Sequence, residues 1–192
     1  MASILKNGII LSNGSPNPNL IAGTTNEEIQ YTYPSSNYSD KFSSTTIIVP
    51  STSQYTLSFW AKSTVSGDKI RAHYYNPNTT TKCESSQGVT TTNSDGNIDI
   101  ILSTSWTYYW IIYTQSSTTS VKSIIFPRLW SGQGTGTVSV KMVKFEEGNI
   151  PTVWIPCVND SIYNGNSSLY EIEDNCKIQK NGYIQSKEFI EF

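Results

Sequence analysis

The sequence predicts an all-β protein built as an antiparallel β-sandwich, with short β-arms at its two ends. The first observation is composition: the 192 residues are rich in Ser, Thr and Asn, only 15% are charged, and 12 Tyr, 5 Trp and 6 Phe are present. So many aromatic residues argue against disorder, and a hydroxyl-rich chain suits short strands. The second is a regular series of strand-like runs, and the third is the lack of a sustained 3.6-residue apolar period.

Nine strand-like runs follow one another along the body of the chain, with turn-forming residues between them. The expected strands are residues 19–22, 27–33, 45–49, 54–62, 69–75, 97–102, 106–114, 121–128 and 137–146. Strand 54–62 alternates cleanly, so one side of it should face the core. That core row is Tyr55, Leu57, Phe59 and Ala61.

Two turns and several aromatic residues allow further local predictions. Residues 103–105 are short enough to join strands 97–102 and 106–114 as a hairpin, and Asp95-Gly96 has the composition of a hairpin turn. Core packing is the ordinary role of an aromatic side chain, and we assign Phe59, Trp106, Trp110 and Trp154 to the core outright.

One motif near the end of the predicted body resembles a known family. From Lys144 the chain reads KFEEGNIPTVWIP, where Gly148 can turn the chain and two prolines stiffen the backbone around Trp154. This E-x-G-x-x-x-T-x-W-x-P pattern resembles the closing motif of carbohydrate-binding-module-like jelly rolls in bacteriophage tail and fibre proteins. The segments YTLSFWAK, ILSTSWTYY and KFEEG also occur in the order found in those modules. The resemblance implies a jelly roll and a virion component assembled in the host cytoplasm.

The two ends of the chain repeat one pattern. Residues 4–12 (ILKNGIILS) and 178–186 (IQKNGYIQS) coincide at Ile, Lys, Asn, Gly, Ile and Ser, and each places Asn-Gly, a type I′ turn composition, between two short arms. Either two hairpins look alike by chance, or both ends bind a neighbouring subunit by strand addition. The assembly residues of the second interpretation are Ile4, Lys6, Asn7, Gly8, Ile10, Ile178, Lys180, Asn181, Gly182 and Ile184.

These arms complete the expected domain organisation. It comprises an N-terminal β-arm (1–18), a jelly roll (19–160) and a C-terminal β-arm for oligomerisation or attachment (161–192). We expect a homo-oligomer, because arms this short cannot bury their apolar residues alone. A trimer is favoured by the resemblance to phage fibres, which are commonly trimeric, and other virion proteins are expected partners.

Charge and motifs exclude several functions. The net charge of −2 and a pI near 5.4 give no basic surface for nucleic acid, and no apolar run approaches a membrane span. The N-terminus lacks the pattern of a secretory signal. The single histidine, His73, has no catalytic partner in its motif, and Glu146 and Glu147 are adjacent and so point to opposite faces of a strand. We therefore expect no enzyme activity.

No cofactor or metal is expected either. Residues 95–99 (DGNID) imitate a calcium loop but lack the downstream Glu, so they are expected to form a turn. The resemblance to jelly-roll carbohydrate modules, which often carry one structural calcium, keeps that ion as an alternative without assigning residues to it. The three cysteines, Cys83, Cys157 and Cys176, form no metal pair or disulfide framework. They are either reduced thiols, as is usual in the cytoplasm, or include a single Cys157–Cys176 bridge.

Glycan recognition is the function that remains. Sugars are bound by aromatic rings that cover their C–H faces and by planar polar groups that pair with hydroxyls. Arg128 and Trp130 lie two residues apart, so they should share one face of an extended segment. The candidate residues are Tyr31, Tyr33, Trp60, Arg71, His73, Tyr75, Arg128 and Trp130. The alternative is a purely structural capsid or tail protein that binds no glycan, because a fold alone does not fix a function.

Overall fold

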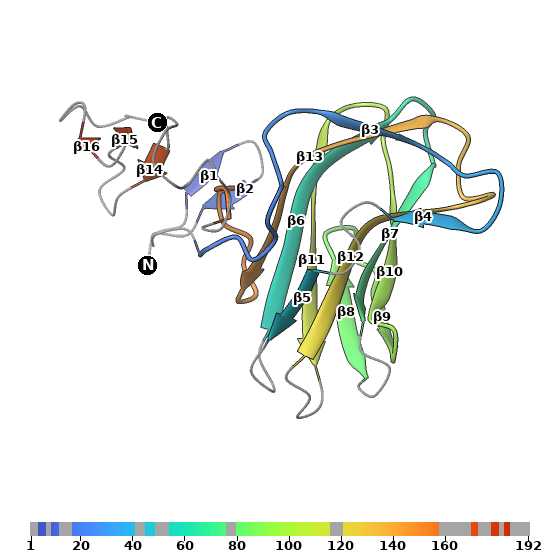
Figure 1. The fold of residues 1–192 in the computed structure, drawn as a ribbon, viewed down its shortest axis with the longest axis horizontal. Coiled ribbons are helices and arrows are strands. Elements are labelled where there is room, and N and C mark those ends of the chain that lie inside the picture. Colours follow the sequence, from blue (N-terminus) through green and yellow to red (C-terminus); the bar gives the residue numbers. More distant parts are fainter. Residues whose placement is uncertain are drawn as a thin grey trace.

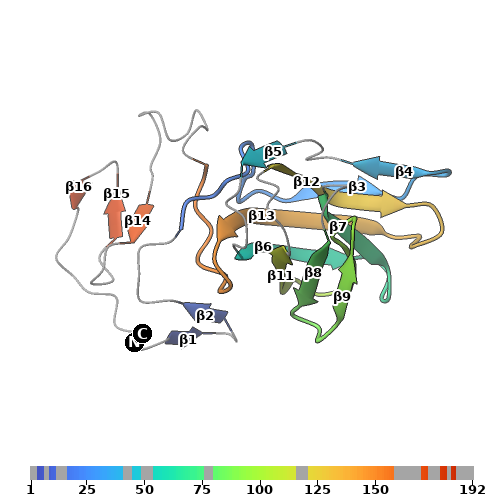
Figure 2. The ribbon, with the colours of Figure 1, turned by 90° about the horizontal axis from the view of Figure 1, so that it is seen from below.

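The structure is a computed structural model that describes residues 4–6, 9–11, 17–40, 45–48, 54–75, 80–115, 121–157, 170–172, 178–180 and 183–184. In these residues the chain is all β, and its body consists of two antiparallel sheets packed as a sandwich (Figures 1 and 2). The described part contains no helix, so none that could cross a membrane. The predicted fold class is confirmed.

The first sheet has five strands. Its order is β10 (Asn97–Ile101), β7 (Lys69–Tyr75), β12 (Val121–Trp130) and β4 (Tyr38–Asp40), and β5 (Thr45–Ile48) pairs with the other end of β12. The second sheet has six strands, in the order β3 (Ile29–Thr32), β13 (Thr137–Glu147), β6 (Gln54–Ser63), β11 (Thr107–Gln115), β8 (Thr81–Ser85) and β9 (Thr90–Asn93).

The core lies between the two sheets and is rich in aromatic side chains. The predicted row Tyr55, Leu57, Phe59 and Ala61 is buried, which confirms the alternation in β6. Rings from the two sheets meet across the sandwich: the centroids of Phe59 and Phe126 are 4.4 Å apart, and those of Tyr74 and Tyr113 4.9 Å apart. Such contacts hold the two sheets face to face. Each sheet also has an outer face, which takes no part in this core.

Two one-residue bulges decide which side chains reach those outer faces. In β12 the pairing with β7 shifts between Ile125 and Arg128, and in β13 the pairing with β6 shifts between Lys141 and Lys144. A bulge adds one residue to one strand and so reverses the inward and outward sets beyond it. The second bulge contains Met142, whose φ is +53°.

Several local predictions were wrong. Residues 19–22 form no strand, because only Asn19 makes a bridge, with Cys157. Residues 103–105 and the Asp95-Gly96 turn do not close hairpins: β9 and β10, and likewise β10 and β11, belong to different sheets, so these turns carry the chain from one sheet to the other. Strands β4, β8 and β9 were not predicted, since they are short and rich in Ser and Thr.

Three tryptophans assigned to the core lie elsewhere. Trp106, Trp110 and Trp154 are only partly buried, whereas Phe59 is fully buried as predicted. On β11 the inward positions are Tyr109, Ile111 and Tyr113, so alternation sends Trp110 to the outer face. The general preference of aromatic side chains for the core was therefore a poor guide to the burial of these indoles.

Both terminal repeats form paired strands. β1 (Ile4–Lys6) pairs with β2 (Ile9–Leu11), and β15 (Ile178–Lys180) pairs with both β14 (Tyr170–Ile172) and β16 (Tyr183–Ile184). The hairpin pairing expected around each Asn-Gly is thus present. The turn residues Asn7, Gly8, Asn181 and Gly182 lie outside the described residues, as does Cys176, so the role of the arms in assembly and the Cys157–Cys176 bridge stay predictions.

Candidate functional site

The outer face of the five-stranded sheet gathers charged and aromatic side chains from four strands and one loop. On β7, Ile70, Ala72 and Tyr74 point into the core, so alternation turns Arg71 and His73 outward. On β12 the bulge places Leu129 inward and its two neighbours outward. We call this group the arginine face; its members are Tyr38, Arg71, His73, Asp99, Arg128, Trp130 and Gln133.

An ion pair forms one half of the arginine face. Arg71 donates from Nε to Asp99 Oδ1 at 2.5 Å and from a terminal nitrogen to Oδ2 at 2.9 Å, a bidentate geometry that is strong for an ion pair. Gln133 Nε2 donates to the same carboxylate at 3.0 Å. The hydrogen bond to Asp99 raises the pKa of Arg71, and burial acts in the opposite direction.

Stacked groups form the other half. The Arg128 guanidinium lies 4.0 Å from the centre of the Tyr38 ring, and the Tyr38 and Trp130 rings are 5.0 Å apart. The same guanidinium has a nitrogen 3.5 Å from Nδ1 of His73. Trp130 also has Arg71 at 5.4 Å from its ring centre, so it joins the two halves. These distances are those of cation–π contacts.

A glycine-rich loop holds Gln133 in its place beside the ion pair. The backbone N–H of Lys69 donates to Gln133 O at 3.0 Å, and the buried Asp68 carboxylate accepts from the N–H of Gly136 at 2.9 Å. The Tyr33 hydroxyl donates to Lys69 O at 2.8 Å. A Cβ at Gly134 would come within 2.2 Å of the Tyr33 ring, so a larger residue there would have to displace that ring. Tyr33 therefore supports the loop.

The structure unites half of the predicted glycan-binding set. Arg71, His73, Arg128 and Trp130 lie together on the arginine face, although His73 is only 6% exposed and its neighbours cover it. Tyr75 is the last residue of the same strand β7, and its side chain lies outside the described residues. Trp60 lies on the opposite outer face, that of the six-stranded sheet.

The remaining candidate, Tyr31, is a correction. It is 7% exposed and belongs to the core, where burial raises its pKa to about 12, so it has no surface for a ligand. Sequence reasoning also missed Tyr38, Asp99 and Gln133. Tyr38 follows a Ser/Asn-rich stretch that reads as a turn, and Gln133 comes from a glycine-rich loop, so neither carries a strand signal.

The outer face of the six-stranded sheet is covered in part by the chain itself. The segment 150–157, which we call the closing segment, lies over β13 and is fastened by the motif noted in the sequence. Thr152 donates its N–H to Glu146 at 2.7 Å and its hydroxyl to the other carboxylate oxygen. The Trp154 indole N–H donates to Thr24 Oγ1 and to Val143 O at 3.2 and 3.1 Å.

A buried ion pair lies beneath this segment. Lys144 Nζ is 3.1 Å from Glu146, and both side chains are 0% exposed. Lys144 also donates to the Thr152 hydroxyl and to Val153 O, the latter at 2.8 Å. Burial lowers the pKa of Lys144, and the Glu146 carboxylate opposes that effect. Glu147, the next residue, is exposed, which agrees with the opposite faces predicted for the two glutamates.

A pocket of about 150 Å³ lies between the closing segment and the sheet. We call it the closing-segment pocket; its lining is Ser58, Trp60, Tyr108, Met142, Thr152, Val153 and Trp154. Met142 stands at its edge in the left-handed region, a conformation that costs a non-glycine residue about 1–3 kcal/mol. Its N–H donates to Thr25 O at 2.8 Å, which helps to hold the bulge.

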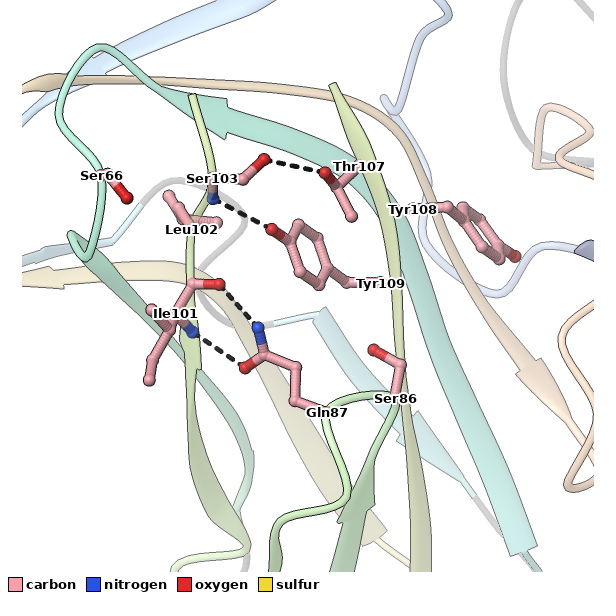
Figure 3. A pocket seen from close by; sticks show the side chains of 9 residues that line it. All are labelled: Ser66, Ser86, Gln87, Ile101, Leu102, Ser103, Thr107, Tyr108 and Tyr109. Atoms are coloured by element: carbon pink, nitrogen blue, oxygen red, sulfur yellow. Dashed lines mark hydrogen bonds between the residues drawn. The ribbon is translucent and has the colours of Figure 1, made fainter. Parts of the chain in front are cut away.

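A second, shallow pocket of about 400 Å³ lies at one edge of the sandwich (Figure 3). Gln87 crosses it and pairs with the edge strand β10: its amide nitrogen donates to Ile101 O at 2.7 Å, and its oxygen accepts from Ile101 N at 3.0 Å. The side chain thus acts as one residue of an extra strand and blocks that part of the edge. Figure 3 shows Tyr108 pointing away from this pocket. The polar groups that line this pocket hydrogen-bond to one another, which suits a structural role.

Among the residues that the structure describes, no group of His, Cys, Asp and Glu could hold a metal ion. The two cysteines there are buried: Cys83 lies in β8, and Cys157 is in the closing segment.

Comparisons with known proteins show similarity in fold alone. No protein-family model and no curated protein matches the chain. Among solved structures, it is similar to an arabinose-bound α-L-arabinofuranosidase (16% identity, TM-score 0.35, 76% of this chain and 23% of that one). It is also similar to the tripod from the baseplate of bacteriophage Tuc2009 (14%, 0.40, 75% and 60%). A third is the CBM22-1 xylan-binding domain of Paenibacillus barcinonensis Xyn10C (7%, 0.31, 66% and 97%). The chain spans about a quarter of the first and 60% of the second.

Proposed function

We propose that the chain is a bacteriophage virion component, a fibre or decoration protein, whose sandwich binds a host-surface oligosaccharide through the arginine face. The observation that supports this most is the convergence of Arg71, Arg128, Trp130 and Tyr38 from three strands on one sheet face that the described chain does not cover. The assignment to a virion rests on the sequence, on the closing motif and the repeated Asn-Gly arms.

The chemistry of this face suits hydroxyl-rich ligands. Tyr38 is 48% exposed, and together with Trp130 it offers ring surface for the C–H face of a sugar. The guanidinium groups and the Asp99 carboxylate are planar. Arg71 and Asp99 hold each other in position and Arg128 stacks on Tyr38, so these groups can pair with hydroxyls at little cost in side-chain entropy. The indole N–H of Trp130 has no hydrogen-bond partner within the described protein, but it is buried beneath its neighbours.

We propose recognition without hydrolysis, and without a cofactor. Glycoside cleavage uses two carboxyl groups on either side of one bond. Asp99 is the only carboxylate among the seven residues of the arginine face, and Arg71 and Gln133 both bind it. A single carboxylate of this kind lacks the second carboxyl group that such cleavage uses.

A glycan array followed by calorimetry tests the proposal. With few aromatic contacts on a shallow surface, one site should bind with a Kd of roughly millimolar to micromolar. The apparent affinity should be higher if several copies share a fibre, because binding is then multivalent. Trp130→Ala should abolish binding and leave the fold intact. Trp110→Ala, on the outer face of the other sheet, is the matched control and should bind as the wild type does.

Failure to bind any glycan in a broad array would favour the alternative, a purely structural protein. The arginine face would then serve only as a stabilised surface, because its arginines already stack on Tyr38 and Trp130. Unfolding of the Trp130→Ala variant would instead show that this side chain supports the sandwich.

The proposed assembly is a homotrimer joined through the terminal arms, with attachment to other virion proteins. Each described arm strand is only two or three residues long, too short to be stable alone. Light scattering should give three times the chain mass for the full-length protein. Deleting residues 1–12 and 177–192 should release a folded monomer; a monomeric full-length protein would contradict the proposal.

A further inference from the structure

We propose that the closing-segment pocket is a second binding site, which takes one neutral sugar ring carrying a methyl group. The pocket lies on the outer face of the six-stranded sheet, so it is separate from the arginine face and does not depend on it. A 6-deoxy sugar and an acetamido sugar both present such a methyl group, and the experiment below separates them.

The size and walls of the pocket set the size of the ligand. At about 150 Å³ it is smaller than the roughly 300–1,000 Å³ of sites for drug-sized molecules, so it can hold one ring but no chain. Trp60 and Tyr108 face each other across β6 and β11, with ring centres 5.4 Å apart and planes at 48°. Trp154 lines the pocket from the closing segment. Three aromatic rings around one small space suit the C–H surface of a sugar.

The walls are fixed before any ligand arrives. The Trp154 indole is held by its two hydrogen bonds, and the bulge at Met142 is held by its bond to Thr25. The closing segment itself is fastened through Thr152 to Glu146. A preformed site avoids the cost of ordering side chains on binding, which matters most for a small ligand.

Beneath the pocket the charges are already paired, which favours a neutral ligand. Lys144 and Glu146 bind each other, and Thr152 contacts both. A charged ligand would lose its hydration in the pocket without gaining a counter-ion from this pair. Of the lining hydroxyls, Ser58 is 2% exposed and hydrogen-bonds to Tyr108, so the partly buried Tyr108 hydroxyl is the one left for a ligand. This hydroxyl can pair with one sugar hydroxyl.

The remaining wall is apolar and calls for the methyl group. Met142 and Val153 line the pocket, and methionine adapts its flexible, polarizable side chain to small apolar groups. The positive φ at Met142 shows that the fold tolerates a strained backbone at this wall. Strain of this type is concentrated at binding sites, where it serves to place a side chain.

Fluorine NMR of the full chain labelled with 5-fluorotryptophan tests the proposal, because the five tryptophans include Trp60 and Trp154 in the pocket and Trp130 on the arginine face. The probes are D-fucose against D-galactose, which carries a hydroxymethyl group where D-fucose has the methyl group, and N-acetylglucosamine against glucose. We expect saturable shifts of the Trp60 and Trp154 signals, an unchanged Trp130 signal, and binding of the better methyl sugar at least about fourfold tighter than its control.

A variant pair completes the test. Trp60→Ala should weaken binding at least about tenfold, which corresponds to losing one well-packed aromatic contact. Trp110→Ala, on the same outer face but outside the pocket lining, should leave it unchanged. If Trp60→Ala fails to fold, the wild-type spectra still decide. Shifts confined to Trp130, equal affinity for sugars with and without the methyl group, or no shift with any probe would each overturn the proposal.

Discussion

On each outer face of the sandwich a β-bulge turns charged side chains outward, but one face is open to solvent and the other is covered in part by the chain. In β12 and in β13 one extra residue reverses the alternation, so that side chains which would otherwise point inward point out. On the five-stranded sheet these are Arg128 and Trp130, which the described chain leaves uncovered. On the six-stranded sheet they are Lys144 and Glu146, which the closing segment covers completely.

The comparison shows that solvent exposure, more than charge, decides whether such a side chain serves the stability of the fold or the binding of a ligand. The Arg71–Asp99 pair has side chains 25% and 28% exposed, whereas both partners of Lys144–Glu146 are 0% exposed. Water screens the first pair and cannot screen the second. Ionic groups on the uncovered face can therefore be exchanged for ligand contacts, and those on the covered face are committed to the fold.

The largest expected effect comes from breaking the covered pair. Glu146→Gln leaves the Lys144 ammonium buried without a carboxylate and weakens the anchor of Thr152. Removing one partner of a buried ion pair destabilises a protein by about 3–5 kcal/mol, because the remaining charge stays desolvated. Urea unfolding monitored by tryptophan fluorescence should show this loss.

The neighbouring glutamate supplies the matched control. Glu147→Gln makes the same chemical change at an exposed position, where surface substitutions stay within about 0.5 kcal/mol. Adding Lys144→Met to Glu146→Gln should recover part of the lost stability, since the stranded charge is then gone. Equal effects of the two single glutamine variants would mean that the closing segment does not seal this pair from water.

The contrast between the faces also shows how far the sequence could predict the structure. The core row of β6 and the closing motif were readable, because strict alternation and Gly/Pro spacing are local properties. The bulges could not be predicted, since an extra residue in a strand can be recognised only when the pairing with the neighbouring strand is known. Trp110 and Tyr31 were placed wrongly for the same reason: the face of a residue depends on the pairing of its strand, and composition does not reveal it.

An intermediate effect is expected from Tyr108, which lies on the covered side. Burial, with a contribution from Glu146, raises the pKa of Tyr108 to about 12, although a hydrogen bond with Ser58 acts in the opposite direction. In the unfolded chain the pKa of tyrosine is about 10. Because the folded pKa is raised, its contribution to stability is complete below pH 10 and is lost as pH rises towards 12. At pH 11 the loss is about 1.4 kcal/mol.

Comparing wild type with Tyr108→Phe isolates this contribution. Between pH 9 and pH 11 the unfolding free energy of the wild type should fall by about 1.4 kcal/mol relative to that of Tyr108→Phe. Absorbance at 295 nm follows tyrosine ionisation in the same samples. A difference that does not vary with pH would show that Tyr108 titrates as it does in the unfolded chain, and that the closing segment leaves it open to water.

The smallest effect is expected on the arginine face, where stability and binding should separate. A double-mutant cycle with Arg71→Met and Asp99→Asn should give a coupling free energy of at most about 1 kcal/mol, because water screens this partly exposed pair, and the coupling should fall as salt is added. Arg128→Ala in the same series should change stability by no more than about 1 kcal/mol and yet remove glycan binding, since its guanidinium and the Tyr38 ring beneath it form the proposed contact surface. Calorimetric titration of each folded variant provides the second measurement. A coupling near that of Lys144 and Glu146 would contradict the comparison, because it would mean that the arginine face is sealed from solvent as its counterpart is.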